Sequence, residues 1–194
     1  MARARIRRFW WPAALSAAAL AAVGCGAMPA SSSSSPSPAT TPSATPTPSS
    51  QAACAANALS AAPGRSSAAT GHVSRVVVLT NTSRTTCVLN GYPDLKRLDA
   101  DAGPVPTKVV QGGGFSFPDQ PPQPVRLAPQ GTASFATDWA TATGYPQGCP
   151  ESTKLQITPP GSSAPLTIDM PVQACPDGTM HVSAIVPGPN GPSR

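Results

Sequence analysis

The chain carries few side chains of the types that perform nucleophilic or acid–base chemistry. It has two histidines, His72 and His181, and no Gly-x-Ser-x-Gly turn that would expose a serine nucleophile. The eight acidic residues are scattered. Asp99 and Asp101 are close enough to form a carboxylate pair on one strand face, although a polar turn is the simpler interpretation. These residues predict no catalytic set, no metal site and no cofactor.

One segment, residues 111–124, gathers glycine, aromatic and proline residues. Gly112, Gly113 and Gly114 precede Phe115 and Phe117, and four prolines follow. The glycines do not predict a phosphate-binding loop, because neither a Lys-Ser/Thr pair nor a helix pattern follows them. A glycine hinge that carries two aromatic rings suits contact with an envelope protein or a glycan. The alternative is that both rings fold back and cover the open end of the domain.

The cysteines predict a disulfide framework. Setting Cys25 aside leaves four, Cys54, Cys87, Cys149 and Cys175. In an exported chain this even number indicates two disulfides, and no Cys/His spacing for zinc accompanies them. Three pairings are open. We favour Cys54–Cys87 and Cys149–Cys175, because each pair brackets one stretch of strand and turn, and each bridge would contribute about 3.5 kcal/mol.

The N-terminus predicts export. Residues 1–24 comprise a basic start with four arginines, an apolar stretch from Phe9 to Val23, and small residues before Cys25. Ala22-Val23-Gly24-Cys25 resembles the lipobox of bacterial lipoproteins. That resemblance implies cleavage before Cys25 and a lipid on its thiol, which would hold the protein at the extracytoplasmic face of the membrane. The alternative is a soluble secreted protein.

Residues 25–53 predict a disordered tether, because beyond the cysteine they consist mostly of Ser, Thr, Pro and Ala and carry no charge. Such a stretch would lift a domain off the membrane and into the wall layer. Removing residues 1–24 also removes four of the thirteen basic residues, leaving nine against eight acidic ones, a net charge of +1. The near-neutral mature chain does not suit nucleic-acid binding.

The rest of the chain has the pattern of a β protein. Residues 73–79 are apolar on both faces, as in a central strand. Residues 133–139 alternate, and Pro165 and Pro171 are expected to bound a strand at 166–170. Short strands punctuated by Pro and Gly predict an antiparallel, immunoglobulin-like β-sandwich over residues 54–187, followed by a disordered tail at 188–194.

Several motifs follow one another in this region. They are Leu79-Thr80-Asn81-Thr82, Cys87-Val88-Leu89, Gly91-Tyr92-Pro93 and the later segment 127–133, followed by Trp139, Cys149 and Cys175. This ordered set resembles the actinobacterial family named domain of unknown function 4232. The resemblance covers about residues 54–186. It implies an exported or lipid-anchored protein and supplies no catalytic residues.

Together these features predict a lipid-anchored envelope protein that presents a noncatalytic binding or structural domain. The alternative function is an envelope hydrolase that acts on wall or glycan through acids such as Asp138 or Asp169. A cluster of carboxylates in a deep cleft would favour the enzyme, and an exposed apolar patch at Phe115 and Phe117 would favour binding. The sequence does not specify an oligomeric state.

Overall fold

The computed structural model describes residues 51–141 and 149–193. The predicted signal peptide, Cys25 and the tether up to residue 50 lie outside the described residues. Within the described ranges, no helix is both long and apolar enough to cross a membrane. The elements are η1 (Ala56–Ala58), β1 (Leu59–Ala69), β2 (His72–Asn81), β3 (Cys87–Leu89), β4 (Asp94–Leu98), β5 (Pro104–Val105), β6 (Lys108–Gln111), β7 (Val125–Leu127), β8 (Thr132–Ala140), β9 (Glu151–Thr158), β10 (Leu166–Gln173), β11 (Thr179–Val182) and β12 (Val186–Pro187).

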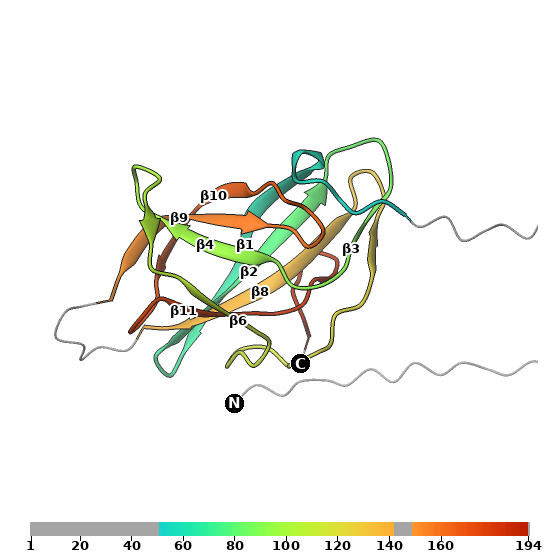
Figure 1. Ribbon diagram of the computed structural model, residues 1–194. Coiled ribbons are helices and arrows are strands. Elements are labelled where there is room, and N and C mark those ends of the chain that lie inside the picture. Colours follow the sequence, from blue (N-terminus) through green and yellow to red (C-terminus); the bar gives the residue numbers. More distant parts are fainter. Residues whose placement is uncertain (1–50, 142–148, 194) are drawn as a thin grey trace, which may run out of the picture. The chain divides into compact units, whose positions relative to one another are not determined.

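The strands form two main sheets that pack face to face (Figure 1). The first has the order β1-β2-β8-β11-β6, with β12 also paired to β8, and the second has the order β10-β9-β4-β5. A third, two-stranded sheet joins β3 to β7. All neighbouring strands run antiparallel except β11 and β6, which are parallel. The predicted all-β, antiparallel sandwich is confirmed.

β2 and β8 form the centre of the first sheet, and β8 is buried on both faces. Their inner faces supply Val77, Leu79 and Phe135, which pack in one core with Leu155 and Ile157 of β9. The outer face of β8 is also inaccessible, although it carries Ser134 and Asp138 (both 0% exposed). A strand buried on both faces needs cover on its second side, and the cover here comes from loops.

Both favoured disulfides are present. Cys54 pairs with Cys87 at a Cα–Cα distance of 4.9 Å, and Cys149 pairs with Cys175 at 5.0 Å. The first bridge joins the segment before η1 to β3, and the second joins the segment just before β9 to the segment after β10. Each bridge therefore closes a loop of a few tens of residues, which restricts the unfolded chain.

Two strands differ from the pattern expected from the sequence. β1 has few bulky apolar residues and contains Pro63 and Gly64, yet it pairs with β2 as an edge strand, with a register shift between Pro63 and Ser66. β10 does not end at Pro171 as predicted. It continues to Gln173, because a register shift between Asp169 and Val172 accommodates the proline.

The predicted disordered tail at 188–194 is wrong for residues 188–193. The amide of Gly188 donates to the Thr132 carbonyl (3.0 Å), and the Ser134 hydroxyl donates to the Gly188 carbonyl (2.6 Å). The Gly191 amide then donates to the Ser134 hydroxyl oxygen (2.9 Å). Buried polar groups require partners, and the tail supplies those of Ser134. The tail therefore covers part of the outer face of β8.

Asn81, where β2 ends, fixes the turn that leads from β2 to β3. Its side-chain amide is fully buried and donates to the carbonyls of Thr85 (2.8 Å) and Leu127 (3.0 Å). Its side-chain oxygen accepts from the Ser83 amide (3.0 Å). The Asn81 side chain is thus a buried tie between the end of β2 and the end of β7.

Candidate functional site

The candidate site is built on the Phe115 loop, which we define as residues 112–117, directly after β6. The loop leaves the sheet through two consecutive left-handed residues, Gly112 (φ 72°) and Gly113 (φ 64°), a conformation that favours glycine. The Gly112 amide donates to the Val182 carbonyl (2.8 Å), and its carbonyl is 3.0 Å from Nδ1 of His181. A Cβ atom at Gly114 would overlap the Phe117 ring. Turn geometry and tight packing thus explain the run of glycines.

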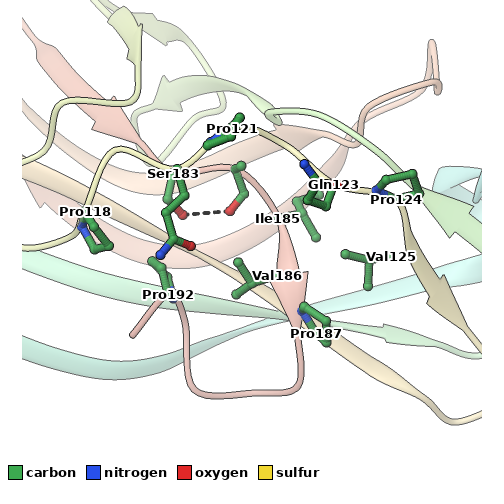
Figure 2. Close-up of a pocket in the computed structure, with 12 residues that line it drawn as sticks. Pro118, Pro121, Gln123, Pro124, Val125, Ser183, Ile185, Val186, Pro187 and Pro192 are labelled. Atoms are coloured by element: carbon green, nitrogen blue, oxygen red, sulfur yellow. Dashed lines mark hydrogen bonds between the residues drawn. The ribbon is translucent and has the colours of Figure 1, made fainter. Parts of the chain in front are cut away.

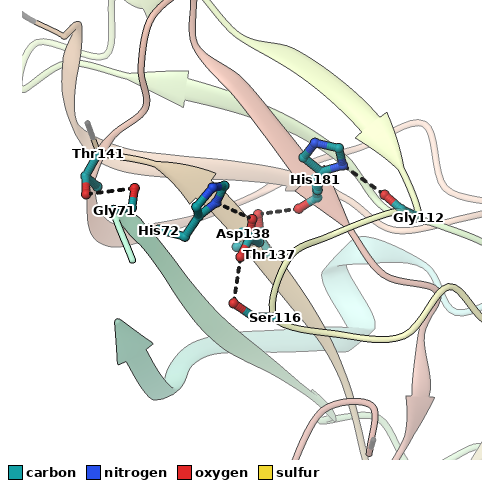
Figure 3. A network of polar contacts seen from close by, with 8 residues as sticks. All are labelled: Gly71, His72, Gly112, Ser116, Thr137, Asp138, Thr141 and His181. Atoms are coloured by element: carbon teal, nitrogen blue, oxygen red, sulfur yellow. Dashed lines mark hydrogen bonds and ion pairs between the residues drawn. The ribbon is translucent and has the colours of Figure 1, made fainter. Parts of the chain in front are cut away.

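Asp138 on β8 ties the loop to the sheet. Its side chain is fully buried, and each carboxylate oxygen has a partner. The Ser116 hydroxyl donates to Oδ2 (2.7 Å), and Nδ1 of His72 lies 3.3 Å from Oδ1 (Figure 3). A buried carboxylate is costly unless it accepts such bonds, so the loop and β2 are both fastened to it.

The structure separates the two aromatic residues that the sequence grouped as partner contacts. The Phe115 side chain is 49% exposed, and its ring stacks on the His72 ring with centroids 4.7 Å apart and an interplanar angle of 18°. Phe117 is only 5% exposed and packs against Gly114. Phe117 is therefore a covering side chain and not an accessible contact, which corrects that part of the prediction. Phe115 remains accessible.

A row of polar residues crosses the outer face of the first sheet beneath the loop. Ser67 of β1 is opposite Ser74 of β2, which is opposite Asp138 of β8, which is opposite His181 of β11. Residues in direct register share one face of a sheet, so these four side chains lie side by side. His72 and His181 are half-buried members of this network (Figure 3).

The network has the wrong order of groups for a nucleophilic triad. In a triad the imidazole lies between the hydroxyl and the acid, and so can accept the hydroxyl proton. Here the carboxylate of Asp138 lies between Ser116 and His72. The Ser116 proton points to a carboxylate that holds it in place, so this arrangement positions a loop and does not activate a nucleophile.

The remaining acidic candidates lie apart from the Phe115 loop. Asp99 Oδ1 accepts from the amides of Asp101 (3.0 Å) and Gly103 (2.7 Å), as the polar-turn interpretation predicted. Asp169 is exposed on β10, in the other sheet. Within residues 51–141 and 149–193, no three His, Cys, Asp or Glu side chains are grouped so that they could hold a metal ion.

Two residues with shifted pKa values, Arg97 and Asp177, also lie away from the Phe115 loop. Arg97 on β4 is fully buried, and burial lowers its pKa. Its guanidinium donates to the carbonyls of Pro106 (2.7 Å) and Pro150 (3.0 Å), so it joins two loops at one end of the sandwich. In the turn before β11, the hydrogen bond from the Thr179 hydroxyl lowers the pKa of Asp177.

An apolar groove of about 220 Å³ follows the Phe115 loop along the chain (Figure 2). One wall carries Pro118, Pro121 and Pro124, spaced three residues apart. The other wall is the segment from Ser183 to Pro187, and Pro192 of the tail also lines it. The proline spacing explains why these three rings share one side, since an extended proline-rich chain repeats every three residues.

The family model of a domain of unknown function (DUF4232) matches residues 54–186. The chain belongs to this family. The match spans the sandwich from the first disulfide cysteine to β12, including the Phe115 loop, and it ends before the tail. No curated relative and no solved structure matches the chain. The site in this DUF4232 domain therefore has to be interpreted from its own geometry.

The sequence identified the Phe115 loop but not its partners in the DUF4232 domain. His72 and Asp138 are 66 residues apart and approach each other only because β2 pairs with β8. The sequence does indicate the face of Asp138. This residue alternates with Phe135, Thr137 and Trp139 along the strand, which places it on the outer face. The sequence did not show that this outer face is covered by a loop and a tail.

Proposed function

We propose that the DUF4232 domain is a noncatalytic binding module that contacts a partner in the cell envelope through Phe115. The observation that carries this proposal is an exposed aromatic ring in a fixed position. Phe115 is stacked on His72, and the next residue, Ser116, is bonded to the buried carboxylate of Asp138. Half of the Phe115 side chain nevertheless faces solvent.

A fixed, exposed aromatic side chain suits binding for two reasons. Keeping an apolar ring in water gives up about 25 cal/mol per Å² of stabilisation that burial would supply, so exposure has a cost for the folded domain alone. A ring already held in one orientation also loses less conformational entropy when a partner binds. The neighbouring Phe117 is buried, which shows that this loop can also hold a phenylalanine ring away from solvent.

We further propose that the protein is held on the extracytoplasmic face of the membrane by a lipid on Cys25. The lipobox-like segment 22–25 and the charge-free stretch that follows it support this location. The two disulfides support an oxidising compartment. The tether would let the binding module reach partners above the membrane surface.

Fractionation of cells that express the full chain tests both parts. Cys25→Ser should move the protein out of the membrane fraction, because the lipid would no longer form, while the domain keeps it associated with the wall fraction. Adding Phe115→Ala to Cys25→Ser should then release most of it into the medium. Adding Asp169→Ala instead, at an exposed position on the other sheet, should leave the wall association unchanged.

The two parts of the proposal fail in different ways. If Cys25→Ser protein stays in the membrane fraction, the lipid anchor is wrong. If Cys25→Ser protein is free in the medium while Phe115 is intact, or if Phe115→Ala changes nothing, the binding function assigned to Phe115 is wrong.

A further inference from the structure

We propose that the domain has a second binding site, a hollow between its two main sheets that holds a small organic carboxylate on Arg75. This site goes beyond the proposed function, because none of its lining residues belongs to the Phe115 loop. Three observations support it. They are a buried guanidinium nitrogen without a partner, an acidic group beside it, and an apolar wall.

The hollow lies where strand ends of one sheet face strand ends of the other. Val73 and Arg75 come from the start of β2, and Trp139 comes from the end of β8. The start of β9 and the end of β10 supply the other side, with Ser152 and Val172 among the lining residues. The volume is about 360 Å³. Sites for small organic ligands usually measure about 300–1,000 Å³, so this hollow suits a small one.

The hollow and the Phe115 loop lie on opposite faces of the first sheet. Side chains alternate between the two faces of a strand, so Val73 and Arg75 share the inner face with Val77 of the core. His72, on which Phe115 stacks, is on the outer face. A ligand in the hollow would therefore contact a different surface of the domain from a partner of Phe115.

Arg75 brings an unpaired positive charge into the hollow. Its Nε atom is buried without a hydrogen-bond partner, and Arg75 forms no ion pair with the described residues. Arg97 also has a buried, unpartnered Nε, but both of its terminal nitrogens donate to main-chain carbonyls, which gives it a structural role. A buried polar group without a partner destabilises a fold. An anionic ligand would supply the acceptors that Arg75 lacks.

The surroundings of Arg75 favour a carboxylate with a single negative charge. A guanidinium presents paired N–H donors that match the two oxygens of a carboxylate. Glu151 lines the same hollow at an exposed position, where its side chain accepts from the Gln173 side-chain amide (2.7 Å). Because Glu151 would repel additional negative charge, the hollow favours a monocarboxylate over a phosphate dianion.

The remainder of the ligand would meet an apolar wall. Trp139 and Val172 are buried core residues that also line the hollow, and Val73 and Pro171 extend the same wall. An aromatic or branched aliphatic group placed there removes apolar surface of both partners from water. The ligand class is therefore a small monocarboxylate that carries an apolar body.

The probe is 3-phenylpropionate, titrated calorimetrically into the full-length protein in detergent. Two matched compounds are titrated in parallel. 3-Phenylpropionamide keeps the apolar body without the charge, and phenyl phosphate carries a doubly charged group. We expect saturable binding of 3-phenylpropionate and at least about tenfold weaker binding of the other two, since a charge-assisted pair with Arg75 would be lost or opposed.

Trp139 reports whether the probe occupies this hollow. The chain has three tryptophans, and the other two are Trp10 and Trp11. In a Trp10→Phe, Trp11→Phe background the emission comes from Trp139 alone. Saturating 3-phenylpropionate should change that emission with the same dissociation constant as the calorimetric titration, because the indole ring would contact the ligand.

Arg75→Met should raise the dissociation constant of 3-phenylpropionate at least about tenfold, because the carboxylate loses its charged donors. Glu151→Gln should lower it about two- to threefold, since the variant removes a negative charge but keeps an oxygen that can accept from Gln173. Arg126→Met is the matched control. It makes the same change at an exposed position on β7 and should leave the dissociation constant unchanged.

Urea unfolding without ligand distinguishes binding from a structural role of Arg75. Arg75→Met should unfold at the same urea concentration as the wild type or at a higher one, because the variant removes a buried nitrogen that has no partner. A lower midpoint for Arg75→Met would show that Arg75 supports the fold and would count against the site.

Three further results would overturn the proposal. The first is the absence of saturable binding of 3-phenylpropionate. The second is equal binding of 3-phenylpropionamide or phenyl phosphate. The third is an unchanged dissociation constant in Arg75→Met or an unchanged Trp139 emission. None of these measurements depends on Phe115, so the second site and the proposed function can fail separately.

Discussion

Asp138 is the residue on which the geometry of the Phe115 loop depends. It is fully buried, and its two oxygens face partners that come from different parts of the chain, Ser116 and His72. Through Ser116 it holds the loop, and through His72 it holds the ring on which Phe115 stacks. Its effect on binding would therefore be indirect, and Asp138 is a positioning residue.

Asp138→Ala should lower the free energy of unfolding by about 2–3 kcal/mol, because it leaves the half-buried Ser116 and His72 groups without their buried acceptor. Ser116→Ala should cost about 1 kcal/mol, since Asp138 keeps its bond to His72. Urea denaturation of the two variants measures both values. An Asp138→Ala variant as stable as the wild type would contradict the assigned role.

At the residue scale, sequence predicts chemistry from local pattern and misses pairings made by the fold. Phe115 and Phe117 were identified together as contacts because they share a loop. Packing then separates them, since the Phe117 ring lies against Gly114 and the Phe115 ring against His72. Residue type alone cannot distinguish two phenylalanines two positions apart, because the distinction depends on what the outer sheet face offers each ring.

Among the elements, the tail and the Phe115 loop share one task, the cover of the outer face of β8. The alternating pattern of residues 133–139 predicted the strand correctly, including the separation of Phe135 and Trp139 from Ser134 and Asp138. It did not predict that both faces are buried. That burial arises from the Phe115 loop and from residues 188–193, and the Gly and Pro content of those tail residues suggests disorder when considered alone.

Deleting residues 188–194 should lower the free energy of unfolding by about 2–4 kcal/mol. The deletion removes the partners of the Ser134 hydroxyl and exposes the outer-face side chain of Val76, which the tail covers at Gly191. Ser134→Ala, which removes the same hydrogen bonds but keeps the cover, is the matched control and should cost less. Thermal or urea unfolding measures both. Equal stability of the deletion variant and the wild type would show that the tail is dispensable.

The absence of β1 from the sequence prediction and the misplaced end of β10 share a physical cause. β1 is an edge strand whose residues are mostly exposed, so it needs few bulky apolar residues of its own. In β10, a register shift lets the strand continue past Pro171, and a bulge of this kind depends on the partner strand β9. Neither feature is visible in a pattern of single residues, because both are properties of pairs of strands.

For the whole molecule, the described domain is a two-sheet sandwich closed by two disulfides. These features, and membership of the DUF4232 family, agree with what the cysteine spacing and the ordered motifs predicted. We propose in addition that the protein is located at the membrane and that Phe115 contacts its partner. The N-terminal segment would fix the protein at the membrane, and the tether would place the Phe115 site within reach of the wall.

The most direct test of this account is photo-crosslinking in living cells at position 115. The variant Phe115→p-benzoylphenylalanine in the full-length protein should yield light-dependent adducts with envelope material, because the ring at this position would touch the partner. The same substitution at Asp169, exposed on the opposite sheet, should yield few. Adducts at position 115 but not at 169 are the predicted result. Equal yields at both positions, or none at position 115, would contradict the claim that Phe115 is the contact.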